Sequence, residues 1–347
     1  MYAFFRPLLF LLDPETAHNL TLQLIHMGAF RPLNLFLRTI YSTPGKPVDA
    51  FGLHFQNPVG LAAGYDKDGI AWRGLAALGF GHIEVGSVTP LPQPGNPKPR
   101  LFRLVEDRAV INRMGFPGRG AEYVAKMLER KPGSNTGNRP NERSVIVGVN
   151  LGKNKDTPLE NAASDFITLM RHFMPVADYL AINVSSPNTV GLRRLQGRDM
   201  LEALLGAISL ERKNITSATR KHFPILVKLA PDLSEGELED ALDVIVRTGM
   251  DGVIATNTTI SREGVRGVQR EETGGLSGEP LRTRSEAVLR SVVKKLDGHL
   301  PVISVGGIMS PEDARRRLDA GATLVQVYTG LVYSGPGLVK RIVKKLQ

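Results

Sequence analysis

The sequence contains no cysteine and only one tryptophan among its 347 residues. Without a thiol the chain forms no disulfide and offers no thiolate as a metal ligand or nucleophile. The absence of cysteine is compatible with a reducing compartment. No stretch reaches the eighteen or so uninterrupted apolar residues that a transmembrane helix needs. No candidate strand leads into G-x-G-x-x-G, which argues against a Rossmann dinucleotide domain.

The overall composition is that of a globular protein, with 42% hydrophobic and 22% charged residues. The length suits one large domain or two average ones. A formal net charge of +10 favours anionic partners such as phosphorylated ligands or anionic lipid. Lys and Arg are scattered along the chain without a nucleic-acid-binding motif, so nucleic acid is not expected as a partner.

Residues 1–41 differ in character from the rest and predict a helical extension. An apolar run over residues 1–12 is followed by Asp13 and Pro14, which are typical of a helix N-cap with Pro at the first helical position. A second, amphipathic helix is expected from apolar residues at helical spacing, namely Ala17, Leu20, Leu24 and Met27.

Two interpretations of this extension stay open. In the first, a pair of helices packs on the main domain and buries its apolar faces. In the second, the apolar side chains enter one leaflet of a membrane while Arg6, Arg31 and Arg38 lie near the headgroups. Because the segment carries three Arg against two acids, its electrostatic attraction is weak and apolar surface must supply most of the binding. Arg6 and Pro7 interrupt the apolar run, which argues against a secretory signal.

Eight short apolar runs alternate with helix-like segments from residue 42 onward. The runs span residues 59–64, 82–87, 145–151, 179–184, 225–229, 252–256, 302–306 and 324–328. Most are rich in Val and Ile, as parallel strands buried on both faces are. Helical segments between them include 201–212, 236–249 and 311–320, and longer insertions occupy 89–119 and 259–280. Eight such units predict an α/β fold, a (β/α)8 TIM barrel over residues 42–347.

Barrel enzymes place their chemistry at the carboxyl ends of the strands. Here almost every strand end supplies an amide, a hydroxyl or a Lys, and hardly any supplies a carboxylate. This set predicts no metal site and suits a heterocycle with carbonyls and a phosphate. Gly306 and Gly307 either form an ordinary turn or bind phosphate through backbone N–H groups, and their place after strand seven favours phosphate. The loop at 183–188 likewise forms a turn in shape and sits at the working end of strand four.

These strand ends resemble those of a known family, the dihydroorotate dehydrogenases, in its quinone-dependent class 2 form. The resemblance runs from about Asp13 onward. Its motifs lie at residues 60–69 (GLAAGYDKDG), 86–90 (GSVTP), 112–116 (NRMGF), 183–188 (NVSSPN), 255–259 (ATNTT), 274–278 (GGLSG) and 305–308 (VGGI). The resemblance implies FMN-dependent oxidation of dihydroorotate to orotate in pyrimidine synthesis, with a membrane quinone as the electron acceptor.

Two features favour class 2 within this family. Class 1 enzymes have a Cys where this sequence has Ser186, and the N-terminal extension is similar to the membrane-associated helices that form the quinone tunnel. No mitochondrial presequence is recognisable. We therefore expect a peripheral location on the cytoplasmic side of a bacterial inner membrane, with contact through residues 1–41.

The resemblance also implies roles for individual residues. Those expected around FMN are Ala62, Ala63, Gly64, Tyr65, Asp66, Ser87, Asn150, Asn183, Lys228, Thr256, Gly278, Gly307, Tyr328 and Thr329. Those expected to hold the orotate ring and its carboxylate are Lys67, Asn112, Arg113, Met114, Gly115, Phe116, Asn183, Asn188, Asn257 and Thr258. Lys228 is expected to offset negative charge on the reduced flavin, with a structural ion pair as the alternative.

Ser186 is expected to be the catalytic base, taking a proton from C5 of dihydroorotate while hydride leaves C6 for the flavin. An unassisted serine is a poor base, and no His or carboxylate adjoins it in the sequence, so a water relay past Thr189 is expected. His18 and Arg103 resemble residues near the quinone head, with Tyr328 between quinone and flavin. The alternative places His18 on a helix surface and makes Arg103 a surface charge.

The sequence departs from the family at Tyr65, where Leu or Phe is frequent, and at Ser87, where Thr is common. Two other functions stay open. One is a soluble relative that uses fumarate or NAD as the electron acceptor. The other is a phosphate-binding barrel without redox chemistry, whose helices serve as a protein-docking surface.

Overall fold

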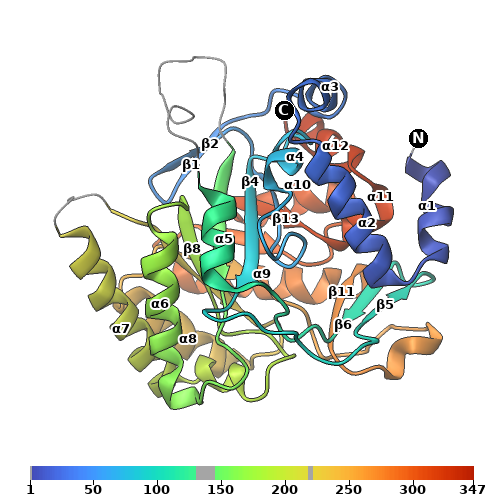
Figure 1. Ribbon diagram of the computed structural model, residues 1–347. Helices are drawn as coiled ribbons and strands as arrows, with labels where there is room; N and C mark the ends of the chain where they lie inside the picture. The colour runs from blue at the N-terminus through green and yellow to red at the C-terminus, as the bar shows by residue number, and fades with distance from the viewer. Residues whose placement is uncertain (1, 130–144, 218–221) are drawn as a thin grey trace.

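The predicted strands close into a parallel barrel, with helices around it (Figure 1). The computed structural model describes residues 2–129, 145–217 and 222–347. The barrel strands are β3 Val59–Leu61, β4 His82–Val88, β7 Ile146–Leu151, β8 Tyr179–Asn183, β9 Ile225–Leu229, β10 Gly252–Ala255, β12 Val302–Val305 and β13 Leu324–Val327. They pair in chain order, and β13 returns to β3. The (β/α)8 prediction is confirmed.

Helices enclose the barrel from outside. They are α4 Trp72–Ala76, α5 Gly120–Leu128, α6 Ala162–Phe173, α7 Arg198–Thr216, α8 Glu235–Arg247, α9 Arg282–Leu296, α10 Pro311–Asp319, α11 Thr329–Ser334 and α12 Gly337–Leu346. Short 3-10 turns lie at η1 Leu159–Asn161, η2 Leu192–Gln196, η3 Val268–Glu271 and η4 Glu279–Leu281. Every residue of β8, β9 and β10 is buried, which explains why these strands are largely apolar in sequence.

A short hairpin closes the amino-terminal end of the barrel. It consists of β1 Val48–Ala50 and β2 Leu53–Phe55. Phe51 and Phe55 pack in one cluster with the barrel residues Tyr179 and Ile254. This end is therefore filled by side chains, and the carboxyl ends of the strands are left to form a site.

The two predicted insertions meet in a three-stranded antiparallel sheet. The sequence indicated only their length, and the structure shows β5 Leu101–Leu104 and β6 Ala109–Asn112 from the first and β11 Gly275–Gly278 from the second. β6 pairs with both neighbours. The sheet packs beside α2, near the carboxyl ends of the barrel strands (Figure 1).

The extension forms three helices where the sequence predicted two: α1 Tyr2–Leu11, α2 Pro14–Met27 and α3 Arg31–Tyr41. The predicted N-cap is confirmed, since the Asp13 carboxylate accepts the N–H groups of Glu15 and Thr16 at 3.0 Å. α2 lies directly on α4. A Cβ added at Gly74 would stand 1.8 Å from the carbonyl oxygen of Ile25, so only glycine permits this approach.

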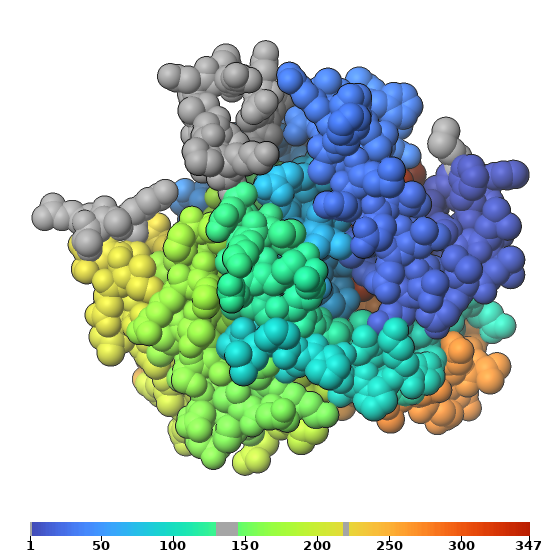
Figure 2. Space-filling model, in the orientation of Figure 1, coloured from blue at the N-terminus to red at the C-terminus, as the bar shows by residue number. Residues whose placement is uncertain are grey.

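Most large apolar side chains of the extension do not face the barrel. Twelve are at least 38% exposed: Phe4, Phe5, Leu8, Leu11, Leu12, Leu20, Leu24, Met27, Phe30, Leu35, Phe36 and Ile40. From the predicted apolar stripe of α2 only Ala17 is buried, so burial of the whole stripe against the main domain is wrong. Figure 2 shows the extension, in dark blue, as a surface layer of the molecule. No helix in the described parts of the chain is long and apolar enough to cross a membrane.

Candidate active site

A cavity of about 460 Å³ lies at the carboxyl ends of the barrel strands. This volume is typical of sites for small molecules and cofactors. The cavity reaches from Gly307 past Lys228 to Glu15 and His18 of α2. The sequence-predicted residues on its wall are His18, Ala62, Ala63, Gly64, Tyr65, Lys67, Ser87, Asn112, Met114, Gly115, Phe116, Asn183, Ser186, Asn188, Lys228, Thr256, Asn257, Thr258, Gly278, Gly307, Tyr328 and Thr329.

Carboxamides from β7, β8 and the loop after β10 form a hydrogen-bonded layer beside the cavity. Asn183 Nδ2 donates to Ser87 Oγ at 2.9 Å and to Asn150 Oδ1 at 3.0 Å. Asn257 Nδ2 in turn donates to Asn183 Oδ1 at 3.2 Å. Because each amide is fixed by its neighbours, the polar groups that face the cavity are oriented before any ligand binds.

A second amide pair borders the cavity and leaves one acceptor unused. Asn188 Nδ2 donates to Asn112 Oδ1 at 2.9 Å. Asn188 Oδ1 is buried and has no partner in the described structure. A buried acceptor without a partner is costly, so this oxygen is suited to an N–H group of a ligand in the cavity.

Ser186 faces the cavity from the loop after β8 and is only 5% exposed. Its Oγ accepts the backbone N–H of Asn188 at 3.2 Å. Within the described residues no His or carboxylate bonds to Ser186, and Thr189 does not bond to it either. The N–H that Asn188 donates stabilises negative charge on Oγ, and a serine that acts as a base must carry such charge.

Lys228 lies over a carboxylate that the sequence reasoning missed. Its Nζ is 3.3 Å from Oε1 of Glu84, which is fully buried in β4. Burial alone would raise the pKa of Glu84, but the Lys228 ammonium and amide donors hold the pKa below its ordinary value. Those amide bonds come from Asn150 and Gln326, each at 2.9 Å.

This arrangement joins the two sequence interpretations of Lys228, since the residue forms a buried ion pair and also lines the cavity. The signal that would have found Glu84 is its position, a carboxylate between the apolar residues Ile83 and Val85 of a buried strand. Charged residues are almost never fully buried unless they are paired, so such a residue predicts a partner inside the barrel.

Lys67 stands where the cavity approaches α2. Burial lowers its pKa to about 8, and the nearby Glu15 carboxylate opposes part of that shift. Its Nζ donates to the carbonyl of Gly64 at 2.6 Å. An ammonium with a pKa this close to neutrality is poised to bind a carboxylate in a pH-dependent manner.

Three aromatic rings connect α2 with the barrel interior. The rings of His18 and Tyr65 are 5.0 Å apart, and those of Tyr65 and Tyr328 are 5.8 Å apart, both edge to face. Burial lowers the pKa of His18 to about 3, so the imidazole is neutral at physiological pH. His18 is therefore not simply a residue of the helix surface.

The turn after β12 approaches its neighbours closely. Gly306 and Gly307 have φ angles of +111° and +70°, a region that side chains other than glycine rarely adopt. A fully buried guanidinium, that of Arg317, donates to the Gly306 carbonyl at 3.0 Å. The turn thus has one fixed conformation, and a positive charge lies behind it.

Four predicted site residues do not form part of the cavity wall. Asp66 accepts the backbone N–H groups of two residues just before α4, and Asn150 belongs to the amide layer without lining the cavity. Arg113 pairs with Glu272 at 2.5 Å. Their predicted ligand contacts remain predictions.

Arg103 is the fourth of these residues, and it holds the end of α1. Its guanidinium donates to the carbonyls of Leu9 at 3.1 Å and Phe10 at 3.3 Å, and also to that of Leu12. It lies 4.6 Å from the centre of the Phe10 ring. Arg103 therefore fixes a helix of the extension to β5, and is not the free surface charge of the alternative interpretation.

Known proteins match this architecture over its full length. The profile of the dihydroorotate dehydrogenase family matches residues 47–347. The chain belongs to this family. A dihydroorotate dehydrogenase (quinone) from Shewanella sp. (strain W3-18-1) is 47% identical over 99% of this chain and 98% of its own. One from Cronobacter sakazakii is also 47% identical, over 99% of each chain.

Solved structures of dihydroorotate dehydrogenase agree with this assignment. The Eimeria tenella enzyme in complex with ferulenol has a TM-score of 0.86 at 41% identity, covering 96% of this chain and 90% of that one. The full-length matches to quinone-dependent relatives include α1 to α3, so the chain belongs to the quinone-dependent class 2 branch of the family.

Proposed function

We propose that this chain oxidises dihydroorotate to orotate with FMN as its cofactor, in pyrimidine biosynthesis, and passes the electrons to a membrane quinone. The observation that carries the proposal is a single cavity in which Ser186, Lys228 and the unpaired Asn188 Oδ1 lie together. The names of full-length relatives support both the reaction and the acceptor.

The cavity wall fits FMN in its chemistry. The turn at Gly306 and Gly307 lines the cavity and is suited to bind a phosphate through backbone N–H groups, with the Arg317 charge behind it. Lys228 presents a cation and the amide layer presents fixed hydrogen-bonding groups, as a ring with imide edges requires. When bound, FMN supplies the acceptor for hydride and the route by which electrons leave for the quinone.

The remaining wall residues bind the substrate and remove its proton. Lys67 binds the carboxylate of dihydroorotate, and Asn112, Asn188 and Asn257 orient its imide edge. Asn188 Oδ1 accepts a ring N–H, which gives this buried oxygen its missing partner. Ser186 Oγ takes the proton from C5, assisted by the N–H that Asn188 donates to it.

The N-terminal extension forms the part of the enzyme that meets the membrane and the quinone. We assign residues 1–41 to the unit that faces the membrane on the cytoplasmic side, because its exposed side chains are largely apolar. The His18 ring of this unit contacts Tyr65, and Tyr65 contacts Tyr328, so these rings would connect the quinone site with the flavin. Arg103 positions α1 at the edge of that passage.

Purified full-length protein tests the proposal. We expect a yellow flavoprotein whose colour is bleached by dihydroorotate and restored by a short-chain quinone, but not by fumarate or NAD. Protein that stays colourless after incubation with FMN would exclude flavin chemistry. Reoxidation by fumarate alone would assign the chain a soluble acceptor.

A further inference from the structure

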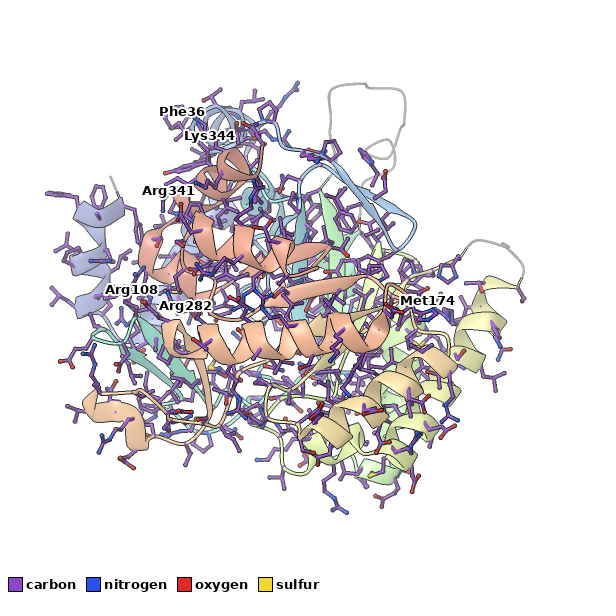
Figure 3. All side chains as sticks on the ribbon, turned by 180° about the vertical axis from the view of Figure 1, so that it is seen from behind. Phe36, Arg108, Met174, Arg282, Arg341 and Lys344 are labelled. Atoms are coloured by element: carbon purple, nitrogen blue, oxygen red, sulfur yellow. The ribbon has the colours of Figure 1, made fainter. Side chains whose placement is uncertain are left out.

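Two helices far apart in the sequence lie side by side at the edge of the exposed apolar surface. α3 of the extension contacts α12. The amino group of Lys340 donates to the carbonyl of Ile40 at 2.5 Å. Figure 3 shows Phe36 of α3 and Lys344 of α12 next to one another at the top of the molecule, with Arg341 below them.

The pair of helices is strongly basic. Together they contain six basic residues and no acid: Arg31, Arg38, Lys340, Arg341, Lys344 and Lys345. α12 buries its apolar side, so its basic residues lie on the opposite side. Lys345 has one acid nearby, Glu312 at 3.8 Å. Arg341 and Lys344 are exposed and have no ion-pair partner in the described parts of the chain.

Exposed apolar side chains adjoin this charge. Leu35 and Phe36 of α3 are 58% and 59% exposed, and they continue the apolar surface of α1 and α2. A lipid bilayer offers the matching partner, because its leaflet takes apolar side chains while headgroup phosphates beside them take Lys and Arg. A surface that combines both kinds of residue over three helices and α12 is complementary to an anionic bilayer.

We infer that α12 supplies the electrostatic part of membrane binding, with Arg341 and Lys344 contacting anionic phospholipid headgroups while α3 enters the leaflet. This inference rests on the membrane placement proposed above. The extension alone has three Arg against two acids, a balance of +1, and α12 adds four basic residues. The balance of +1 in residues 1–41 alone therefore underestimates the positive charge that the folded protein presents to a membrane.

Vesicle flotation of full-length protein tests this surface. Vesicles of phosphatidylcholine are compared with vesicles that also contain about one third phosphatidylglycerol, at low and high salt. We expect tighter binding to the anionic vesicles, an excess that salt removes. The double variant Arg341→Gln with Lys344→Gln should bind them roughly thirtyfold more weakly and bind neutral vesicles as the parent does.

The matched control is Lys213→Gln with Lys294→Gln, two exposed lysines on α7 and α9. It removes the same charge elsewhere and should bind like the parent protein. Equal losses in both double variants, or no loss in the first, would overturn the assignment to α12. If the parent protein binds neither vesicle, the membrane placement itself fails, whereas turnover with a soluble quinone still tests the proposed reaction separately.

Discussion

Glu15 of α2 and Arg100 of the first insertion form an ion pair through two hydrogen bonds, of 2.8 and 3.1 Å. Arg100 also donates to the carbonyl of Asn96 at 2.9 Å, and the Asn96 amide donates to the carbonyl of Asn188 at 3.2 Å. An unbroken set of hydrogen bonds thus joins the extension to the loop that carries Ser186.

Replacing Glu15 with Gln should weaken both ends of this connection. Arg100 would keep its burial and lose its charge partner, which should cost about 2 kcal/mol of folding free energy. We expect a lower melting temperature and a higher KM for dihydroorotate. Glu122→Gln, which breaks an exposed pair with Lys126, is the control and should change neither. An unchanged KM for Glu15→Gln would show that the connection is structural only.

Ser186→Ala should keep FMN bound and slow its reduction by dihydroorotate about 10³-fold, because only proton removal is lost. Stopped-flow bleaching of the flavin measures this step without the quinone. Ser186→Cys should recover part of the rate, since a thiol titrates nearer to neutrality. Bleaching of the Ala variant at the parent rate would remove Ser186 from the mechanism.

The pKa of about 8 at Lys67 predicts a pH profile. At a pH below this pKa the Lys67 ammonium is charged and binds the substrate carboxylate. As the pH rises past the pKa, Lys67 loses its proton and its charge. We therefore expect kcat/KM for dihydroorotate to fall above pH 8, approaching about tenfold per pH unit. The Lys67→Gln variant should have a low kcat/KM that does not decline above pH 8. The Lys67→Arg variant should keep its charge, and therefore its kcat/KM, to higher pH. A decline that persists in the Gln variant would point to another group.

Glu84→Gln removes the charge that offsets Lys228. The uncompensated cation should raise the reduction potential of bound flavin, and folding free energy should fall by about 3 kcal/mol. Lys228→Met should shift the potential in the opposite direction. Spectroelectrochemical titration measures both variants, and shifts of the same sign would mean that the pair acts only through packing.

The barrel could be predicted from the sequence because its strands are buried on both faces. Runs such as 225–229 and 302–306 therefore stand out by hydrophobicity alone, and the site loops follow from where each run ends. The loop that holds Ser186 and Asn188 was located in this way, and the family resemblance then implied their roles. Their position in one cavity with Lys67 depended on the barrel being closed.

Other features could not be predicted from the sequence because they depend on contacts between distant segments. Nothing local to Arg100 indicates that it pairs with Glu15, and nothing local to Arg103 indicates that it holds α1. The stripe of α2 was assigned by periodicity, which separates two faces without saying which one meets the barrel. The structure buries Ala17 and exposes Leu20, Leu24 and Met27.

The bond between Lys340 and Ile40 joins residues 300 positions apart. During synthesis the apolar helices of the extension therefore emerge long before α12, against which α3 packs. Domains generally fold as units during synthesis, and apolar surface left open at that stage favours aggregation. The nascent chain thus exposes the apolar surface of its N-terminal helices throughout translation. Early binding to lipid or to a chaperone would protect this surface from aggregation.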